Sequence, residues 1–260
     1  MTLKMLILGV LQGLSEFLPV SSSGHLVLGQ KFLGITENAL AGVVILHLGT
    51  LAALLVFFAP KIWNIASGAF SKKAETRRNN WRLILFIVLA SIPAAMVGLL
   101  AREPIKEMFS EPLYIPFFLI GTGIILLITR WKRDKQHGIG LSDALIIGIA
   151  QAVAIVPGFS RSGFTIATAL LLGLLEEDAF EFSFLLSIPA VAAANLLELK
   201  DIVSLGNPPA LIVGVIASFV VGLFALWALK KLVVNKKFWL FSFYCFAMGA
   251  LSLILLLVFK

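Results

Sequence analysis

The sequence predicts an all-α polytopic membrane protein built as an inverted-topology repeat, in which each half has one re-entrant helical hairpin and three transmembrane helices. Three observations lead to this fold class. Hydrophobic residues make up 60% of the 260 residues and charged residues 13%, and the mean hydropathy is +1.01; soluble domains carry roughly 25% charged residues. Apolar runs of about 20 residues recur along the chain, and the basic residues gather in three short segments. We expect a single integral-membrane domain over residues 1–260.

Six apolar runs are long enough to cross about 30 Å of hydrocarbon as helices. Most of the 21 Lys and Arg residues lie between these runs, in the segments 60–82, 130–138 and 230–237, and the positive-inside rule places such segments in the cytoplasm. The segments 102–112 and 199–208 then become external loops. The expected spans are 39–59, 83–101, 113–129, 182–198, 209–229 and 238–259.

Two further stretches, 1–38 and 139–181, are apolar but are interrupted by polar segments. The second stretch has to begin and end in the cytoplasm, and its apolar run over 164–175 is too short to cross. We therefore expect a re-entrant hairpin whose tip is the segment 157–163. The first stretch has the same design, with a helix that ends at Pro19, a Ser/Gly tip and a short apolar return, and it enters from the outside.

The two hairpins match each other at a constant offset of 139 residues. Most of the matched positions are polar or glycine, which apolar composition does not explain. We therefore infer an internal duplication, with repeat one over about 1–138 and repeat two over about 139–260. Three spans per half is an odd number, so the second copy is inserted upside down. The matched pairs include Gly9/Gly148, Gln12/Gln151, Ser21/Ser160, Ser23/Ser162 and Gly24/Gly163.

Irregular backbone is tolerated at membrane depth only where protein or water satisfies its polar groups, so the two tips should meet near the midplane and form the functional site. Both hairpins restart a helix directly after a Ser/Gly tip, and a helix N-terminus attracts an anion. Arg161 adds a planar fork suited to phosphate, so a phosphate group is the ligand we expect. The candidate site residues are Gln12, Glu16, Ser21, Ser22, Ser23 and His25 in the first hairpin, and Ser160, Arg161, Ser162 and Thr165 in the second.

Structural roles compete with these functional ones. Glu16 and Arg161 could be each other's structural partner, although intramembrane charges usually mark functional sites. The tip serines could be capping or helix-packing residues, and the spacing of Gly9 and Gly13 indicates a close-packed helix face. His47 lies mid-span with no acid near it in the sequence, which favours an interhelical hydrogen bond.

Two motifs resemble those of a known family. The segment 12–25 reads Gln-Gly-Leu-Ser-Glu-Phe-Leu-Pro-Val-Ser-Ser-Ser-Gly-His, and the segment 157–165 reads Pro-Gly-Phe-Ser-Arg-Ser-Gly-Phe-Thr. They resemble the first and second motifs of the undecaprenyl-diphosphate phosphatases of the bacitracin-resistance type, and length and helix count fit that family over the whole chain. The resemblance implies hydrolysis of undecaprenyl diphosphate to undecaprenyl phosphate and phosphate, which recycles the carrier lipid for peptidoglycan synthesis and confers bacitracin resistance.

The resemblance also implies catalytic roles. The family's catalytic positions fall on Glu16, Ser22, His25, Ser160, Arg161 and Thr165. Phosphoryl transfer needs a nucleophile, a proton acceptor and charge stabilisation on the phosphate oxygens. Glu16 would be the general base. Either Ser22 attacks with help from His25, or His25 attacks through a phosphohistidine.

The expected substrate contacts come from the remaining polar residues of the two tips. Arg161 would clamp the phosphates, assisted by the binding residues Gln12, Ser21, Ser23, Ser160, Ser162 and Thr165. The first acid of the family's Glu-x-x-x-Glu pattern is Gln12 here, a variant that the family accepts, which disfavours a mechanism with two carboxylates on one metal. A divalent cation, Mg²⁺ or Ca²⁺, held by Glu16 and the diphosphate is the one cofactor we expect, and no organic cofactor is expected.

A second class of function fits the same architecture, because inverted repeats and broken helices at the midplane are typical of secondary transporters and lipid flippases. The combination of a carboxylate with Ser22 and His25 beside Arg161 favours an enzyme. The expected partners are the polyprenyl diphosphate lipid and membrane lipids. Nucleic acid is not expected, because the basic segments lack interleaved aromatic residues. The resemblance implies the bacterial plasma membrane, with the active site open to the extracytoplasmic side.

Overall fold

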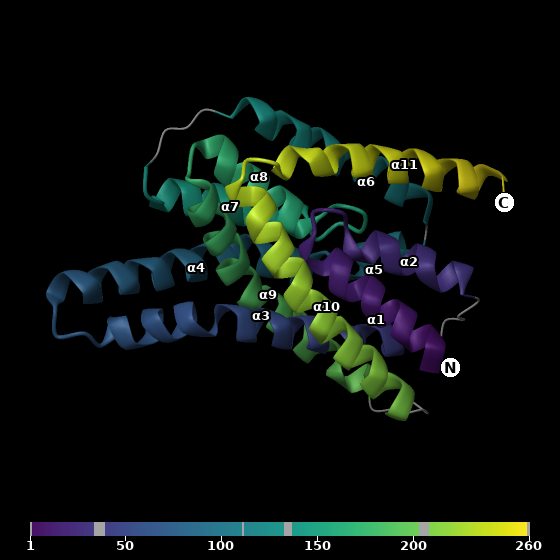
Figure 1. Cartoon of the computed structure of the whole chain (residues 1–260), viewed down its shortest axis with the longest axis horizontal. Coiled ribbons are helices and arrows are strands. Elements are labelled where there is room, and N and C mark those ends of the chain that lie inside the picture. The colour runs from purple at the N-terminus through teal and green to yellow at the C-terminus, as the bar shows by residue number, and fades with distance from the viewer. Residues whose placement is uncertain (1, 34–39, 111, 133–136, 203–207, 259–260) are drawn as a thin grey trace.

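The computed structural model describes residues 2–33, 40–110, 112–132, 137–202 and 208–258, and every regular element in these ranges is a helix (Figure 1). The α-helices are α1 Thr2–Phe17, α2 Ser22–Phe32, α3 Leu40–Ala69, α4 Ala74–Leu100, α5 Arg102–Ser110, α6 Ile115–Ile128, α7 Leu141–Val153, α8 Arg161–Leu172, α9 Glu176–Ile202, α10 Pro208–Val234 and α11 Phe241–Val258. Short 3-10 turns are η2 Pro112–Tyr114, η3 Thr129–Trp131 and η4 Phe238–Leu240.

The helices have the length and composition of membrane spans, which confirms the prediction of an all-helical polytopic membrane protein. Five stretches in the described ranges are long and apolar enough to cross: Ile45–Ala69, Ala74–Leu100, Glu176–Leu196, Pro209–Val234 and Phe238–Val258. They cover five of the six expected spans. The remaining expected span, 113–129, corresponds to the shorter apolar helix over Ile115–Trp131.

Two segments that we expected to be loops are helical. Most of the segment 60–82 extends α3 and α4, which project side by side beyond the rest of the bundle in Figure 1 and are joined by a turn at 70–73. The Trp81 indole N–H donates to the Ala69 carbonyl at 3.0 Å and holds this turn together. The segment 102–112 is mostly helix α5. Hydropathy marks where an apolar surface ends, whereas a helix continues wherever its backbone hydrogen bonds and side-chain propensities allow.

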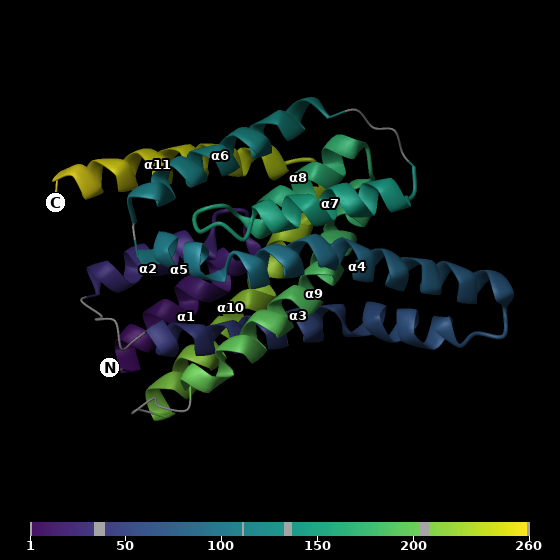
Figure 2. The same ribbon diagram turned by 180° about the vertical axis from the view of Figure 1, so that it is seen from behind.

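Each hairpin has its first helix pressed against a long helix from the other part of the chain. Helix α1 packs on α10, and α7 packs on α4 (Figure 2). Both contacts depend on glycine: a Cβ at Gly9 would clash with the Gly214 carbonyl, and a Cβ at Gly148 would clash with the Ala90 carbonyl. Small residues let membrane helices approach closely, so the structure confirms the close-packed face expected at Gly9 and extends it to the matched position Gly148.

A cluster of phenylalanine rings supports the end of α1, where the site begins. Phe17 meets Phe184 of α9 edge to face, with ring centroids 5.8 Å apart, and Phe184 lies 4.7 Å from Phe180. Phe58 of α3 stacks on both of these α9 rings. Because Phe17 is almost fully buried against these rings of α3 and α9, its neighbour Glu16 at the end of α1 is held at a fixed place.

The α4–α7 contact gives a stability prediction. Replacement of Gly148 by Ala should lower the free energy of unfolding by about 1–3 kcal/mol, the usual effect of overpacking, because its Cβ meets backbone that cannot rotate away. Thermal unfolding in detergent measures the change. Gly98→Ala on α4 is the matched control, since a Cβ there meets nothing within 4 Å and Ala favours a helix by up to about 1 kcal/mol. Equal melting temperatures for the two variants would contradict close packing at Gly148.

Candidate active site

Each hairpin turns on a serine that caps the helix after it. Ser160 precedes α8, and its Oγ accepts a hydrogen bond from the Gly163 N–H at 3.1 Å. Ser21 precedes α2, and its Oγ accepts from the Gly24 N–H at 3.3 Å. Serine is among the preferred N-cap residues. The structure therefore confirms the alternative role of these two serines as helix caps. At both tips the first N–H groups of the following helix carry a partial positive charge.

The two tips contact each other, as the sequence predicts. The Gly158 N–H of the second tip donates to Ser23 Oγ at 3.3 Å, and Ser162 Oγ donates to the Leu18 carbonyl of the first tip at 3.3 Å. Ser23 and Ser162 are matched positions of the two hairpins. Because these contacts satisfy backbone groups that no helix satisfies, the irregular tips are stable inside the bundle.

Glu16 is the centre of the site. Its carboxylate is buried and accepts hydrogen bonds from Ser22 Oγ at 2.7 Å and from Gln12 Nε2 at 3.1 Å. The other carboxylate oxygen pairs with Arg161 Nη2 at 2.5 Å. His47 Nε2 lies 3.8 Å from Oε2. One carboxylate thus joins both hairpins and helix α3.

Arg161 links the first hairpin to α9. While Nη2 pairs with Glu16, Nη1 donates to the Ser187 carbonyl at a long 3.5 Å. A crevice beside it is lined by Arg161, Ser162, Thr165, Ser183, Phe184 and Ser187. Thr165 donates its hydroxyl to the Arg161 carbonyl at 3.0 Å, so the expected phosphate ligand Thr165 is turned toward its own helix.

His25 is held by partners that the sequence did not predict. Its Nδ1 lies 2.9 Å from the Ser21 carbonyl, and its Nε2 lies 2.7 Å from the hydroxyl of Tyr244 on α11. The two rings are also stacked, with centroids 5.7 Å apart. We expected His25 to orient Ser22 or take its proton, but the Ser22 hydroxyl donates to Glu16 and both ring nitrogens of His25 are engaged elsewhere. The three-residue spacing on α2 places the two side chains near each other without joining them.

Helix α3 contributes two residues that sequence reasoning did not include in the site. His47 lies near Glu16, where we expected no acid, and Thr50 Oγ1 accepts from Gln12 Nε2 at 3.3 Å. They are three residues apart in the part of α3 before Pro60, which is otherwise apolar, and so share a face. Two polar residues at helical spacing inside a span were the available signal.

The donor set suits a divalent cation that is held largely by substrate. Across the described ranges no group of three His, Cys, Asp or Glu side chains could hold a metal by itself. Glu16 supplies one carboxylate, and Gln12 Oε1 is a buried oxygen with no hydrogen-bond donor. Mg²⁺ is commonly bound by one or two carboxylates together with substrate phosphates. Glu16, Gln12 Oε1 and phosphate oxygens fit that pattern.

Comparison with known proteins identifies the family. The model of the bacitracin resistance protein BacA family matches residues 5–251. The chain belongs to this family. It is 42% identical to the undecaprenyl-diphosphatase of Desulforapulum autotrophicum over 95% of this chain and 96% of the relative. It is 39% identical to the undecaprenyl-diphosphatase of Thermotoga maritima over 95% and 98% of the two chains, and 38% identical to that of Methanosphaera stadtmanae over 98% of each.

Membership of the BacA family covers both hairpins and the helices around them. The matched range 5–251 includes all ten predicted site residues, together with the unpredicted contacts His47, Thr50 and Tyr244. Its boundaries lie in α1 and α11. The family match therefore applies to the assembled site as a whole and not to one motif.

The ion pair gives a prediction about stability. Glu16→Gln and Arg161→Gln should each lower the free energy of unfolding by about 3 kcal/mol, because each leaves an unpaired buried charge, and the double variant should lose much less than the sum. Thermal unfolding in detergent measures the cycle. The exposed pair Glu177 and Lys230, 2.8 Å apart, is the matched control and should show a coupling of at most about 1 kcal/mol. Additive losses at Glu16 and Arg161 would contradict the coupling.

Proposed function

We propose that this chain hydrolyses undecaprenyl diphosphate to undecaprenyl phosphate and inorganic phosphate, which returns the carrier lipid to peptidoglycan synthesis and confers resistance to bacitracin. The observation that carries the proposal is the single network in which Glu16 joins Ser22 and Arg161 where the hairpin tips meet. A carboxylate, a hydroxyl and a guanidinium are a base, a nucleophile and an anion ligand, the groups that phosphoryl transfer needs. The relatives named undecaprenyl-diphosphatase support the same reaction.

The diphosphate binds at the start of α2 and α8, where two helix N-termini attract an anion. Arg161 then has a second anion to pair with, and the phosphate competes with Glu16 for its guanidinium. Binding therefore draws Arg161 from Glu16 and leaves the carboxylate able to accept a proton. The polar groups proposed to complete the binding site are Gln12, Ser21, Ser23, Ser160, Ser162 and Thr165.

Chemistry begins at Ser22, whose hydroxyl already donates to Glu16 at 2.7 Å. Ser22 Oγ bonds to the terminal phosphorus, the bond from that phosphorus to the bridging oxygen breaks, and undecaprenyl phosphate leaves. The proton passes from Ser22 to Glu16 and on to the leaving phosphate. Water then attacks the phosphoserine, Glu16 accepts its proton and returns it to Ser22 Oγ, and inorganic phosphate is released.

The competing assignment makes His25 the nucleophile. It requires one ring nitrogen to leave either the Ser21 carbonyl or the Tyr244 hydroxyl, which hold it at 2.9 and 2.7 Å. Ser22 needs no such rearrangement, which supports Ser22 as the attacking group. His25 and Tyr244 then act by holding the first turn of α2 in place.

A divalent cation, Mg²⁺ or Ca²⁺, is part of the proposal. Glu16 and Gln12 Oε1 would hold it with the phosphate oxygens, and when bound it would neutralise charge on the diphosphate. In the phosphate-release assay described below, EDTA should remove activity and either cation should restore it. Activity that survives full chelation would remove the cation from the proposal.

We further propose that the chain is an inverted repeat with six spans, in which α6 with η3 is the sixth. The matched caps of the two tips support the duplication, and so do the reciprocal packing of α1 on α10 and of α7 on α4. The basic turns after α3 and α10 then face the cytoplasm. The first hairpin enters from the outside, which opens the site to the extracytoplasmic face of the bacterial plasma membrane.

Phosphate release tests the proposed function. Purified protein in detergent should release phosphate from undecaprenyl diphosphate, and Glu16→Gln should abolish release while lipid binding persists. Gln12→Glu, on the same helix face, is the matched control and should retain activity. Arg161→Lys keeps the charge and loses the fork, so kcat should fall by about 10²–10³. Lipid binding without phosphate release by the unaltered protein would favour a transporter or flippase. A fully active Arg161→Lys variant would contradict the role of Arg161 as a bidentate ligand of the diphosphate.

Trapping of a phosphorylated enzyme distinguishes Ser22 from His25 as the nucleophile. Ser22→Ala should lose nearly all turnover, because no other hydroxyl donates to Glu16 in the described ranges. Ser15→Ala is the control and should stay active, because the Ser15 hydroxyl donates to the Leu11 carbonyl of its own helix. Acid quenching with terminally labelled substrate should trap label on Ser22, and a parallel alkaline quench preserves any phosphohistidine. A base-stable, acid-labile adduct that persists in Ser22→Ala would identify His25 instead. If no adduct forms with any variant, water activated by Glu16 is the attacking group.

Cysteine labelling tests the topology. The natural Cys245 is buried and should react little with a maleimide, so the labelling of a single introduced cysteine can be measured. In spheroplasts, a membrane-impermeant maleimide should label Glu107→Cys, whereas Lys72→Cys and Asn235→Cys should react only after the membrane is permeabilised. Labelling of Asn235→Cys from outside would show that one proposed span or hairpin has the wrong orientation, and the six-span proposal would fall.

A further inference from the structure

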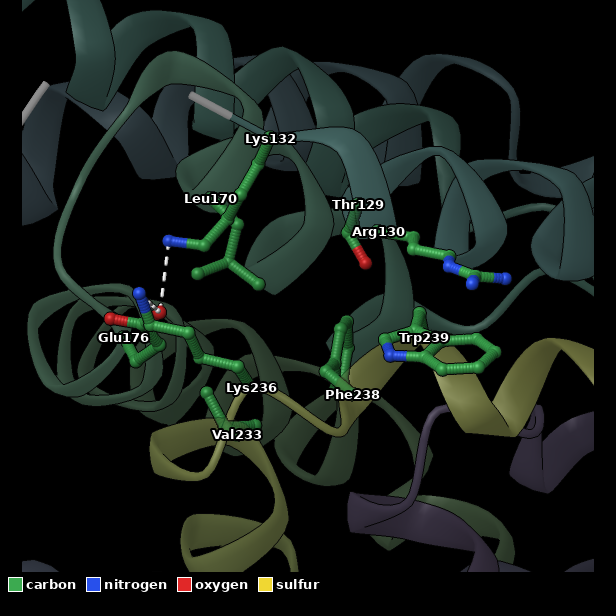
Figure 3. Close-up of a pocket in the computed structure, with 9 residues that line it drawn as sticks. All are labelled: Thr129, Arg130, Lys132, Leu170, Glu176, Val233, Lys236, Phe238 and Trp239. Atoms are coloured by element: carbon green, nitrogen blue, oxygen red, sulfur yellow. Dashed lines mark ion pairs between the residues drawn. The ribbon is translucent and has the colours of Figure 1, made fainter. Parts of the chain in front are cut away.

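Helix α9 buries polar side chains at its start and in its middle. Glu176 begins the helix, and its Oε1 lies 3.0 Å from Lys132 Nζ and 3.6 Å from Lys236 Nζ. Figure 3 shows both ammonium groups turned toward this carboxylate. Further along, Ser187 donates its hydroxyl to the Phe184 carbonyl of the same helix at 2.7 Å. The carboxylate therefore has ion-pair partners, and this hydroxyl has a hydrogen-bond partner.

Ser183, one turn before Ser187, differs from both groups. Only 3% of this residue is exposed, and its Oγ has no hydrogen-bond partner among the described residues. A serine inside a helix commonly donates to a carbonyl one turn earlier, as Ser15 and Ser218 do here at 2.6 and 2.9 Å. A buried hydroxyl without a hydrogen bond is unfavourable. The Ser183 hydroxyl is therefore available to a ligand.

This hydroxyl lines the crevice beside Arg161. Positions four residues apart lie on one face of a helix, and on this face of α9 Nη1 of Arg161 donates to the Ser187 carbonyl at a long 3.5 Å, while Nη2 pairs with Glu16. A guanidinium has five N–H donors, so Arg161 has donors left after these two bonds. An anion between Arg161 and α9 would accept hydrogen bonds from Arg161 and from Ser183 together.

We infer that Ser183 binds the lipid-linked phosphate of the substrate, the phosphate that leaves as part of undecaprenyl phosphate. The inference rests on the proposed function, in which Ser22 attacks the terminal phosphorus. Attacking and leaving oxygens lie roughly in line in phosphoryl transfer, so the leaving phosphate lies on the side of the terminal phosphate away from Ser22. Ser22 donates to Glu16, and the end of Arg161 away from Glu16 faces α9. One guanidinium thus contacts both phosphates, and Ser183 donates to the one that leaves.

A donor at this place has two effects on the reaction. Negative charge develops on the leaving phosphate as the bond to the bridging oxygen breaks, and a donor already in position stabilises that charge. The donor also favours a diphosphate over a monophosphate, because a single phosphate held beside Ser22 does not extend to α9. Ser183 is therefore a substrate-binding residue that lies outside both sequence motifs.

Calorimetric titration of the purified protein in detergent tests the inference with two probes. One is inorganic phosphate, and the other is methylene diphosphonate, a diphosphate analogue whose bridge cannot be hydrolysed. The unaltered protein should bind the diphosphonate more tightly than phosphate. Ser183→Ala should weaken diphosphonate binding about tenfold, the effect of losing one hydrogen bond to a charged group, and should leave phosphate binding unchanged. Because the hydroxyl has no partner among the described residues, the variant should keep the melting temperature of the unaltered protein.

A control variant and a kinetic measurement make the test specific. Ser252→Ala removes an equally buried hydroxyl on α11 that donates to the Gly249 carbonyl of its own helix, and it should bind both probes like the unaltered protein. In the phosphate-release assay, Ser183→Ala should lose about tenfold in kcat/KM for undecaprenyl diphosphate, whereas Ser252→Ala should lose nothing.

The outcomes decide the inference separately from the proposed hydrolysis, because the titration needs no turnover. The inference is overturned if the unaltered protein binds the diphosphonate no more tightly than phosphate, if Ser183→Ala binds it as tightly as the unaltered protein, or if this variant loses the same factor for both probes. An unaltered protein that releases no phosphate, but whose diphosphonate binding depends on Ser183, would contradict the hydrolysis and support the diphosphate site.

Discussion

The pairing of Glu16 with Arg161 is the constraint on which the rest of the structure depends. A buried carboxylate and a largely buried guanidinium are each very unfavourable alone in an apolar interior, and here each comes from a different hairpin. The two hairpins must therefore enter the bundle deeply enough for these groups to meet. Ser22, Gln12 and His47 surround the same carboxylate, so the ion pair also determines which other polar groups can be present.

The same depth creates a second requirement, because a hairpin tip exposes backbone groups that no helix satisfies. Ser21 and Ser160 satisfy the first N–H groups of α2 and α8, and Ser23 and Ser162 satisfy groups of the opposite tip. Residues that were candidate ligands thus hold the tips together. The phosphate site proposed at the helix N-termini would be a consequence of this arrangement, since the capped helices direct their positive ends to the place where the hairpins meet.

The sequence was informative wherever polar residues interrupt apolar surroundings. Glu16 and Arg161 stand out for this reason, and the matched serines predicted that the tips resemble each other. Helix ends were harder to predict from the sequence. The polar extension of α3 beyond Pro60 and helix α5 are formed by backbone hydrogen bonds, which hydropathy does not report. The partner of His25 was not predictable, because Tyr244 is 219 residues away in the chain and reaches it only through the packing of α11.

The reciprocal packing of the hairpins has a consequence for biogenesis. Helix α1 rests on α10, which begins only at Pro208 and so leaves the ribosome long after α1. Until α10 is inserted, the face of α1 at Gly9 and Gly13, which fits closely against α10, lacks this partner. We therefore expect the first hairpin to reach its final place only after α10 has been inserted. Because α1 packs on α10 and α7 packs on α4, we expect the site to be assembled late in membrane insertion.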